Sequence, residues 1–337
     1  MAQFPSNTSA YGVWNMMDVR DAVMGGNWPS TGPLFSYVGT LGTSGADMQL
    51  SVPIGGTTIF ALRLSSVSFG TSTLYRSTDG GATWVTGGSV AGSGSQYGQG
   101  LLALSNTVVI VQNRGYFYRS TDAGDTFTQI LATSGGQNNF FTICSDGTNG
   151  ICAGYNQNVI TSNNWVSASA VGRPYGIVMA TAALTNNGSN VFLHAPLGSS
   201  GSPFTAYIGN TAGSSTIASF SVAGNQSIAA SNPTNGFNAF MNIAEGAPSG
   251  NVYYATYPGT SYTTANLTGI TWGWTGYHAV TSDNKVLCPF SNGLWLVQPG
   301  TTPLLVSAFT NFGGVCLDVT GSRNFAIRLT GEVYRYV

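Results

Sequence analysis

The stretch that decides the fold is TLYRSTDGGATWVTG at 73–87, which returns as YFYRSTDAGDTFTQI at 116–130. Each copy follows an apolar run, TTIFALRL at 57–64 and TVVIVQNR at 107–114. The repeated unit is therefore a strand, a turn, a second strand, an Asp-centred turn and a third strand. Two copies of one such unit indicate a repeat architecture.

Weaker copies of the strand–turn–strand pattern continue along the rest of the chain. They begin near residues 150, 190, 239, 285 and 324, after the two clear copies that begin near 58 and 107. Neighbouring copies are thus 39–49 residues apart. This spacing fits four-stranded blades of roughly 40–50 residues, so the sequence predicts an all-β, seven-bladed β-propeller over 33–337. A β-sandwich would explain the strands but not their spacing.

The two ends of the chain predict how the ring closes. The seventh copy, NFAIRLTGEVYRYV at 324–337, stops before it has an outer strand. The segment PLFSYVGT at 33–40 has the length and alternation to supply that strand. An N-terminal strand that pairs with 332–337 would join the first and last blades and remove an open seam.

Residues 1–32 differ from the rest of the chain. We expect NMMDVRDAVM at 15–24 to form one short helix, capped by Asn15. A helix of this length is marginal by itself in water, so its aromatic flanks, Trp14 and Trp28, are expected to hold it against its own propeller or against a partner. We interpret 1–32 as an N-terminal anchoring arm.

Charge is scarce in this chain. Asp, Glu, Lys and Arg make up 6% of the residues and the net charge is -1, whereas about a quarter of an average globular chain is charged. Nucleic-acid binding needs cations that neutralise phosphates, and Lys285 is the only lysine. No apolar stretch approaches the ~18 residues of a membrane span, and the N-terminus does not resemble a signal peptide. We therefore expect no nucleic acid, no membrane insertion, and folding in the cytoplasm.

The cysteines and histidines are expected to be structural. Cys144 and Cys152 would face each other in a hairpin centred on Thr148. A disulfide between them is one alternative, and reduced thiols, which are normal in the cytosol, are the expected one. His194 and His278 lack partners at ligand spacing, and no glycine-rich loop precedes a helix. We expect neither a metal nor a cofactor.

The two Asp-centred turns share the pattern S-x-D-x-G-x-T followed by an aromatic residue. In such a turn the Asp carboxylate can accept backbone N–H groups, Gly permits a positive φ, and the aromatic ring pins the turn to its neighbours. The residues of the pattern are Ser77, Asp79, Gly81, Thr83 and Trp84 in the first copy, and Ser120, Asp122, Gly124, Thr126 and Phe127 in the second.

This pattern resembles the Asp-box repeat of sialidases and related propellers. There the Asp-boxes join the third and outer strands, away from the catalytic face, so the resemblance implies a propeller fold and a structural role for these residues. The catalytic set of sialidases is not matched: Glu245 and Glu332 are the only glutamates, and no Arg lies in an F-R-I-P motif.

Other glycosidases need two carboxylates on either side of one bond. Asp146, Asp283 and Asp318 are available for this, and each fits a turn equally well. We expect a non-enzymatic protein, with a glycan-cleaving propeller as an alternative.

A second resemblance lies in the arm. Gly12-Val13-Trp14, then 18–24, then Asn27-Trp28-Pro29 is similar to the G-x-W … W-P opening segments of virion structural proteins from tailed bacteriophages. The resemblance implies that the arm docks to other virion proteins and that the propeller is displayed on the virion surface. The expected role is host attachment as a tail-fibre-like or receptor-binding component that contacts a surface glycan or protein. A capsid decoration or head-fibre protein that stabilises the shell is the alternative. The anchoring residues would be Trp14, Asp18, Trp28 and Pro29.

The possible binding surface is expected opposite the Asp-centred turns. Loops between blades, and between second and third strands, open there, including 92–100, 171–176 and 269–278. Flat aromatic rings with a few donors suit a sugar or a protein hot spot, although the same rings could pack between blades. The candidates are Tyr97, Arg114, Arg173, Tyr175, Trp272, Trp274, Tyr277 and His278.

Overall fold

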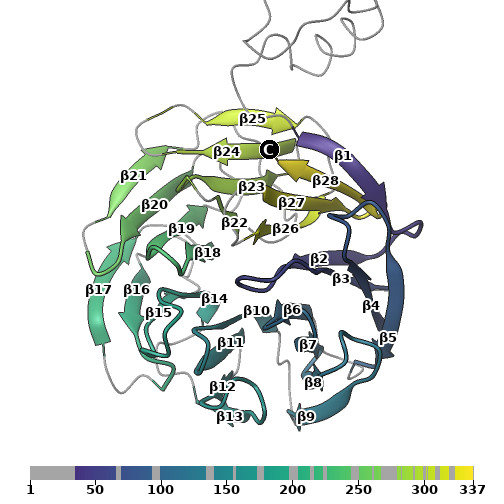
Figure 1. The fold of residues 1–337 in the computed structure, drawn as a ribbon. Coiled ribbons are helices and arrows are strands. Elements are labelled where there is room, and N and C mark those ends of the chain that lie inside the picture. The colour runs from purple at the N-terminus through teal and green to yellow at the C-terminus, as the bar shows by residue number, and fades with distance from the viewer. Residues whose placement is uncertain are drawn as a thin grey trace, which may run out of the picture.

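A computed structural model of the chain describes residues 35–65, 70–92, 99–133, 140–154, 157–172, 178–196, 204–212, 216–222, 226–243, 250–259, 262–266, 279–281, 283–290, 293–298, 301, 303–307, 312–318 and 323–336. Within these residues, twenty-eight strands form seven four-stranded sheets. Figure 1 shows the sheets as blades around a common centre. The predicted seven-bladed propeller is confirmed. This described part of the chain contains no helix that could span a membrane.

We number the blades in chain order and give their strands from the centre outwards. Blade 1 contains β2 (Asp47–Ser51), β3 (Ile59–Leu64), β4 (Ser72–Ser77) and β5 (Val85–Val90). Blade 2 contains β6 (Gln99–Ala103), β7 (Val109–Asn113), β8 (Tyr116–Ser120) and β9 (Thr128–Ala132). Blade 3 contains β10 (Phe140–Ser145), β11 (Gly150–Gly154), β12 (Asn158–Thr161) and β13 (Ser169–Val171). Blade 4 contains β14 (Val178–Ala183), β15 (Phe192–Pro196), β16 (Phe204–Gly209) and β17 (Thr216–Val222).

The remaining three blades follow the same order. Blade 5 contains β18 (Gln226–Asn232), β19 (Phe237–Ile243), β20 (Gly250–Thr256) and β21 (Thr263–Asn266). Blade 6 contains β22 (Ala279–Val280), β23 (Val286–Phe290), β24 (Gly293–Val297) and β25 (Leu304–Ser307). Blade 7 contains β26 (Phe312–Asp318), β27 (Arg323–Arg328), β28 (Glu332–Tyr336) and β1 (Phe35–Thr40).

The middle strands are apolar on both sides because each lies between two neighbouring blades. In β3 the sequence IFALRL does not alternate between apolar and polar residues. Ile59 packs in a cluster with Phe325 of blade 7, whereas the adjacent Phe60 packs in a cluster with Val111 of blade 2. A strand that is buried on both faces is expected to be continuously apolar.

The hydrophobic core therefore lies between the blades rather than in one central mass. Buried clusters join blade 7 to blade 1, and then each blade to the next around the ring. Burial of apolar surface contributes about 25 cal/mol per Å². Each blade consequently depends on its two neighbours for much of its stability.

The N-terminal strand closes the ring as predicted. β1 pairs antiparallel with β28, from Phe35 opposite Tyr336 to Thr40 opposite Glu332. In Figure 1 the two ends of the colour scale, purple β1 and yellow β28, lie side by side. The predicted arm at 1–32, with its helix at 15–24, lies outside the described residues.

Strand direction divides the turns between two faces. Because the strands of a blade are antiparallel, its first–second and third–fourth turns lie at one end, which we call the Asp-turn face. The second–third turns and the connections between blades lie at the other end, which we call the opposite face.

Candidate functional site

The two Asp-centred turns join β4 to β5 and β8 to β9. In the first, the Asp79 carboxylate accepts hydrogen bonds from the Thr83 backbone N–H at 3.0 Å, the Thr83 hydroxyl at 2.6 Å and the Ser77 hydroxyl at 2.8 Å. The Gly81 N–H donates to the Ser77 hydroxyl, and the Trp84 indole N–H donates to the Gly81 carbonyl. The bonds from Thr83 and then Ser77 lower the pKa of Asp79 to about 2.

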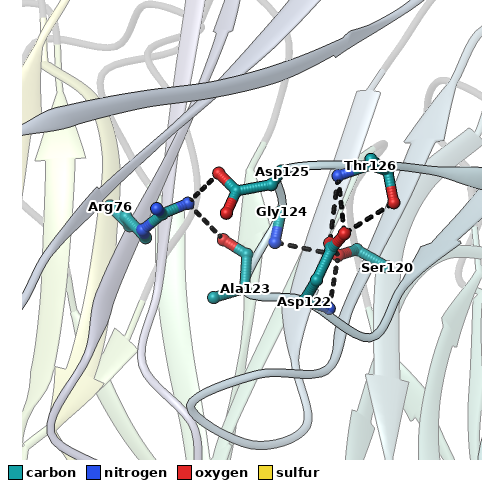
Figure 2. A network of polar contacts seen from close by, with 7 residues as sticks. All are labelled: Arg76, Ser120, Asp122, Ala123, Gly124, Asp125 and Thr126. Carbon is teal, nitrogen blue, oxygen red and sulfur yellow. Dashed lines mark hydrogen bonds and ion pairs between the residues drawn. The ribbon is translucent and has the colours of Figure 1, made fainter.

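The second turn repeats this arrangement residue by residue. Figure 2 shows Asp122 accepting from Thr126 and Ser120, while the Gly124 N–H donates to the Ser120 hydroxyl. Hydrogen bonds from Thr126, then from Ser120, hold the pKa of Asp122 well below its usual range. The turn chemistry predicted from the sequence is therefore present in both copies.

Each turn also rests on the outer strands of the preceding blade. The Gly88 N–H of β5 donates to the Gly124 carbonyl at 2.7 Å. Arg76 of β4 donates to the Ala123 carbonyl at 3.2 Å and forms an ion pair with Asp125 (Figure 2). The second turn thus connects blade 2 to blade 1.

The first turn has the same relation to blade 7. A Cβ on Gly39 of β1 would lie 2.2 Å from the Gly81 carbonyl oxygen, so this strand needs glycine for the turn to approach. Trp84 packs against the cluster that joins blades 7 and 1, and Phe127 packs against the one that joins blades 1 and 2. Through these contacts both turns connect neighbouring blades.

A third turn of this kind joins β12 to β13 and was missed in the sequence. The Thr161 hydroxyl donates to the Asn163 side-chain oxygen at 2.8 Å, and that oxygen accepts the Ser167 N–H at 3.1 Å. Trp165 stands where the other turns have glycine, with a φ of 61°. Its ring is buried and stacks on Phe117 with centroids 6.1 Å apart. The spacing T-x-N-x-x-x-S could have revealed this turn, but its neutral Asn and bulky Trp conceal the match.

Two of the three carboxylates considered for glycan cleavage are parts of turns. Asp146, which is fully buried between β10 and β11, accepts the N–H groups of Thr148, Asn149 and Asn190 at 2.7–3.0 Å. Since Asn190 belongs to blade 4, Asp146 fastens blade 3 to blade 4. Asp283 accepts from the Thr281 hydroxyl and forms an ion pair with Lys285. Asp318 ends β26, and its side chain lies outside the described set.

Asp47 was not singled out in the sequence. It begins β2 at the opposite face and accepts the Met48 N–H at 2.8 Å. Burial raises the pKa of Asp47 to about 6, against the lowering effect of hydrogen bonds from Met48, Gln99 and Gln49. In the sequence, a single Asp at the start of an apolar strand was the feature that could have indicated this buried carboxyl group. Among the described residues, no group of three His, Cys, Asp or Glu side chains could hold a metal ion.

A pocket of about 260 Å³ opens on the Asp-turn face. Its walls come from the ends of the inner strands β2, β6, β10, β14 and β18, from the turns that follow them and, at Asn164, from the β12–β13 turn. Val52, Leu102, Leu104, Ala183 and Ala230 are among its apolar lining residues. The pocket was not predicted, because it is assembled from short segments of five blades that lie far apart in the sequence.

Comparisons with known proteins give information on the fold. No protein-family model matches this chain, and no curated protein matches it. Solved structures do match. The β-propeller domain of Myceliophteria thermophila Cps50 (Swd1) has a TM-score of 0.61 at 10% identity, over 90% of this chain and 99% of that one. The shared feature is the propeller fold.

Two further propellers show the same level of similarity. Kuenenia stuttgartiensis hydrazine synthase has a TM-score of 0.63 at 11% identity, over 87% of this chain and 95% of that one. YCF48 bound to D1 peptide has a TM-score of 0.56 at 14% identity, over 91% and 96%. At such identities the propeller fold is what these proteins have in common with this chain.

Of the possible binding residues on the opposite face of this propeller, Arg114 is described. It lies in the β7–β8 turn, on the predicted face, but only 2% of it is exposed, and its side chain lies against Gly92. Arg114 therefore does not present its guanidinium group to solvent. Tyr97, Arg173, Tyr175, Trp272, Trp274, Tyr277 and His278 lie outside the described residues, as do Trp14, Asp18, Trp28 and Pro29 of the arm.

The prediction that Cys144 and Cys152 face each other across the hairpin is wrong. In the β10–β11 hairpin Cys144 lies opposite Ile151, and Cys152 lies opposite Ile143. The hairpin is centred half a position away from Thr148, so the two side chains point to different faces of the blade. Both thiols are free. His194 is fully buried beside Phe192, and burial lowers its pKa to about 4, so it is neutral.

Proposed function

We propose that this chain is a non-enzymatic attachment protein, a structural component of a tailed-bacteriophage virion. In this proposal the arm at 1–32 docks to other virion proteins and the propeller is displayed on the particle for contact with a host-surface glycan or protein. The two Asp-centred turns are, in this proposal, Asp-box repeats that stabilise the displayed domain.

The proposal of a non-enzymatic role is supported by the contacts of the acidic side chains. In the described residues, Asp47, Asp79, Asp122, Asp146 and Asp283 each accept a hydrogen bond from their own strand or turn. Asp125 and Glu332 form ion pairs with Arg76 and Arg328, and the side chain of Asp318 lies outside the described set. Glycoside hydrolysis needs a pair of carboxylates that flank one bond, whereas these groups are distributed among several blades as structural cross-links.

The composition and the fold support the proposal that the chain is a virion component. A chain with 6% charged residues and 46 glycines is typical of phage fibre and decoration proteins. Ring closure leaves the arm attached directly to β1, so the arm can be held by a partner while the closed ring projects from it. One propeller of similar fold, YCF48, is bound to a peptide, which supports a binding role for the fold here.

The experiment compares particles that carry the full chain with particles that carry a version lacking 1–32. We expect the shortened protein to be soluble and folded but absent from purified particles, measured by quantitative mass spectrometry. Particles without the propeller should adsorb to host cells at least ten-fold more slowly. Incorporation without the arm would contradict anchoring. Normal adsorption of particles without the protein would contradict attachment, and reduced heat resistance of those particles would favour shell decoration.

A further inference from the structure

The pocket on the Asp-turn face is lined by aliphatic and uncharged polar side chains. Val52, Leu102 and Leu104 contribute aliphatic groups to its lining. The pocket is lined by no Asp, Glu, Lys, Arg or His among the described residues, and Cys144 in its wall stays a neutral thiol, because burial raises its pKa to about 12. An occupant therefore meets no charge that could balance a charge of its own.

Two carboxamides of the lining remain available for hydrogen bonding. Asn186, which is exposed, makes no side-chain hydrogen bond to another described residue, and the Nδ2 of Asn164 makes none either. Both line the pocket beside the β10–β11 turn: a Cβ on Gly147 would lie 3.5 Å from the Asn186 Oδ1, and the Asn164 Oδ1 accepts the Ser145 hydroxyl at 3.5 Å. A carboxamide offers both a donor and an acceptor, which is the pattern that a peptide bond requires.

Size restricts the occupant further. The volume of about 260 Å³ is below the ~300–1,000 Å³ of pockets that enclose drug-sized ligands. It suits one or two aliphatic side chains. Among the described residues of the lining there is no aromatic ring on which a sugar could stack, while Ile54 is 37% exposed and extends the apolar surface outwards.

The walls of the pocket are held in place by the contacts between blades. Asp146 fastens the turn that carries Ser145 and Gly147 to the turn that carries Asn186, through Asn190. The Ser231 hydroxyl donates to the Ala183 carbonyl at 2.6 Å, which connects blade 5 to blade 4. A preformed wall lowers the ordering cost of binding.

We propose that this pocket binds an uncharged peptide segment of a protein partner, with an aliphatic side chain against the aliphatic lining residues and its backbone amide on Asn164 and Asn186. The proposal deepens the proposed attachment function, on which it rests. It assigns the recognised molecule to the protein class rather than the glycan class, and it places recognition on the Asp-turn face.

The test uses the full chain with labelled Ile, Leu and Val methyl groups in NMR titrations. The probes are the capped tripeptide acetyl-Ala-Leu-Ala-amide, its versions with central Asp and central Lys, and a neutral trisaccharide. We expect saturable shifts of the Val52, Leu102 and Leu104 methyl signals with the Leu peptide alone. Equal shifts with the charged peptides, shifts with the trisaccharide instead, or no saturable shift with any peptide would overturn the proposal.

Two variants locate the site. Ile54→Asp places a charge in the lining and should weaken Leu-peptide binding at least ten-fold, and Asn186→Ala should weaken it about five-fold. Leu304→Asp is the matched control, since Leu304 is an exposed aliphatic residue on the outer strand of blade 6. Equal weakening by Leu304→Asp would overturn the assignment.

The same variants separate this inference from the attachment role. Particles that carry Ile54→Asp should adsorb at least five-fold more slowly than particles that carry Leu304→Asp. If both adsorb normally while particles without the propeller do not, attachment stands and the peptide pocket is refuted as its site. If particles without the propeller adsorb normally while the Leu peptide binds, attachment is refuted and the pocket stands.

Discussion

At the scale of single residues, the acidic side chains of the described residues serve mainly as cross-links. Asp79 and Asp122 each close a turn that rests on the preceding blade, and Asp146 joins two blades from a fully buried position. Buried or hydrogen-bonded carboxylates tolerate this role because backbone N–H groups replace the water that they lose. Asp146 and Asp283, two of the three carboxylates considered for glycan cleavage, take part in such contacts.

The first prediction concerns Asp79 and its neutral counterpart Asn163. Hydrogen bonds lower the pKa of Asp79 to about 2 in the folded protein, from 3.8. Its contribution to stability is therefore present above pH 4 and is lost as the pH falls towards 2. We expect Asp79→Asn to lower the thermal midpoint at pH 7, with a difference from the parent protein that shrinks in acid, measured by circular dichroism from pH 7 to pH 2.

Asn163→Asp is the reverse exchange in the third turn, where Ser167 already donates its N–H to position 163. It should raise the thermal midpoint at pH 7 and lose that advantage below pH 4. A pH-independent effect of both variants would contradict the assigned carboxylate bonds.

The second prediction concerns Asp47, whose pKa burial raises from 3.8 to about 6. A raised folded pKa means that the stability contributed by the protonated form is complete below pH 3.8 and is lost as the pH rises through 6. Asp47→Asn should therefore be more stable than the parent at pH 7, by up to about 3 kcal/mol, and equal to it near pH 4. Urea unfolding between pH 4 and pH 7 measures this, and a constant difference across that range would refute the raised pKa.

At the scale of strands and turns, the contacts between an Asp-centred turn and the strand beside it require small residues. Gly39 of β1 lies so close to the first turn that a Cβ would be 2.2 Å from the Gly81 oxygen and 2.7 Å from the Ala82 oxygen. Both of these are backbone atoms and cannot rotate away. The outer strand and the turn must therefore have matching sequences, although they lie more than forty positions apart.

Gly39→Ala should consequently destabilise the protein by about 1–3 kcal/mol, the usual cost of overpacking. Gly172→Ala is the control, because a Cβ there would meet no atom within 4 Å, and it should change stability by less than about 0.5 kcal/mol. Chemical denaturation of both variants measures the difference. Equal stability of the two would show that the turn can withdraw from β1.

Ring closure gives the next prediction. β28 is paired on one side by β27 and on the other by β1. Removing 1–32 should leave the thermal midpoint unchanged, whereas removing 1–40 should expose the edge of β28 and cause association between chains. Size-exclusion chromatography with light scattering distinguishes the two deletions. An insoluble product after removal of 1–32 would show instead that the arm belongs to the packing of the propeller.

At the scale of the whole molecule, the core is divided into clusters that neighbouring blades share around a closed ring. A blade removed from this ring would expose both of its apolar faces, so the blades are expected to unfold together. The reactivity of two free thiols can report on unfolding of the separate blades. Cys152 in blade 3 and Cys288 in blade 6 are both buried, and burial raises their pKa values.

We expect both thiols to react with a maleimide reagent at the same urea concentration, coincident with the loss of the circular-dichroism signal. Peptide mapping by mass spectrometry follows each site. Reaction of Cys152 well before Cys288 would show that part of the ring opens alone.

The sequence by itself determined the architecture, because its evidence was local and repeated. Short segments of the sequence show the blade spacing, the two Asp-centred turns and the lack of an outer strand in the seventh copy. The pairing of β1 with β28 follows from counting the strands. The chemistry of Asp79 and Asp122 was predictable for the same reason, since their partners lie within four positions.

Only the tertiary structure decided the features that depend on contacts between blades. Asn190 reaches Asp146 across 44 positions, and Arg76 reaches Asp125 across 49. The turn 146–149 sets the centre of the β10–β11 hairpin. That centre lies half a position from Thr148, which puts Cys144 and Cys152 on different faces of the blade. The pocket on the Asp-turn face is lined by short segments of five blades. Such features leave no local sequence pattern, because they depend on contacts between residues of different blades.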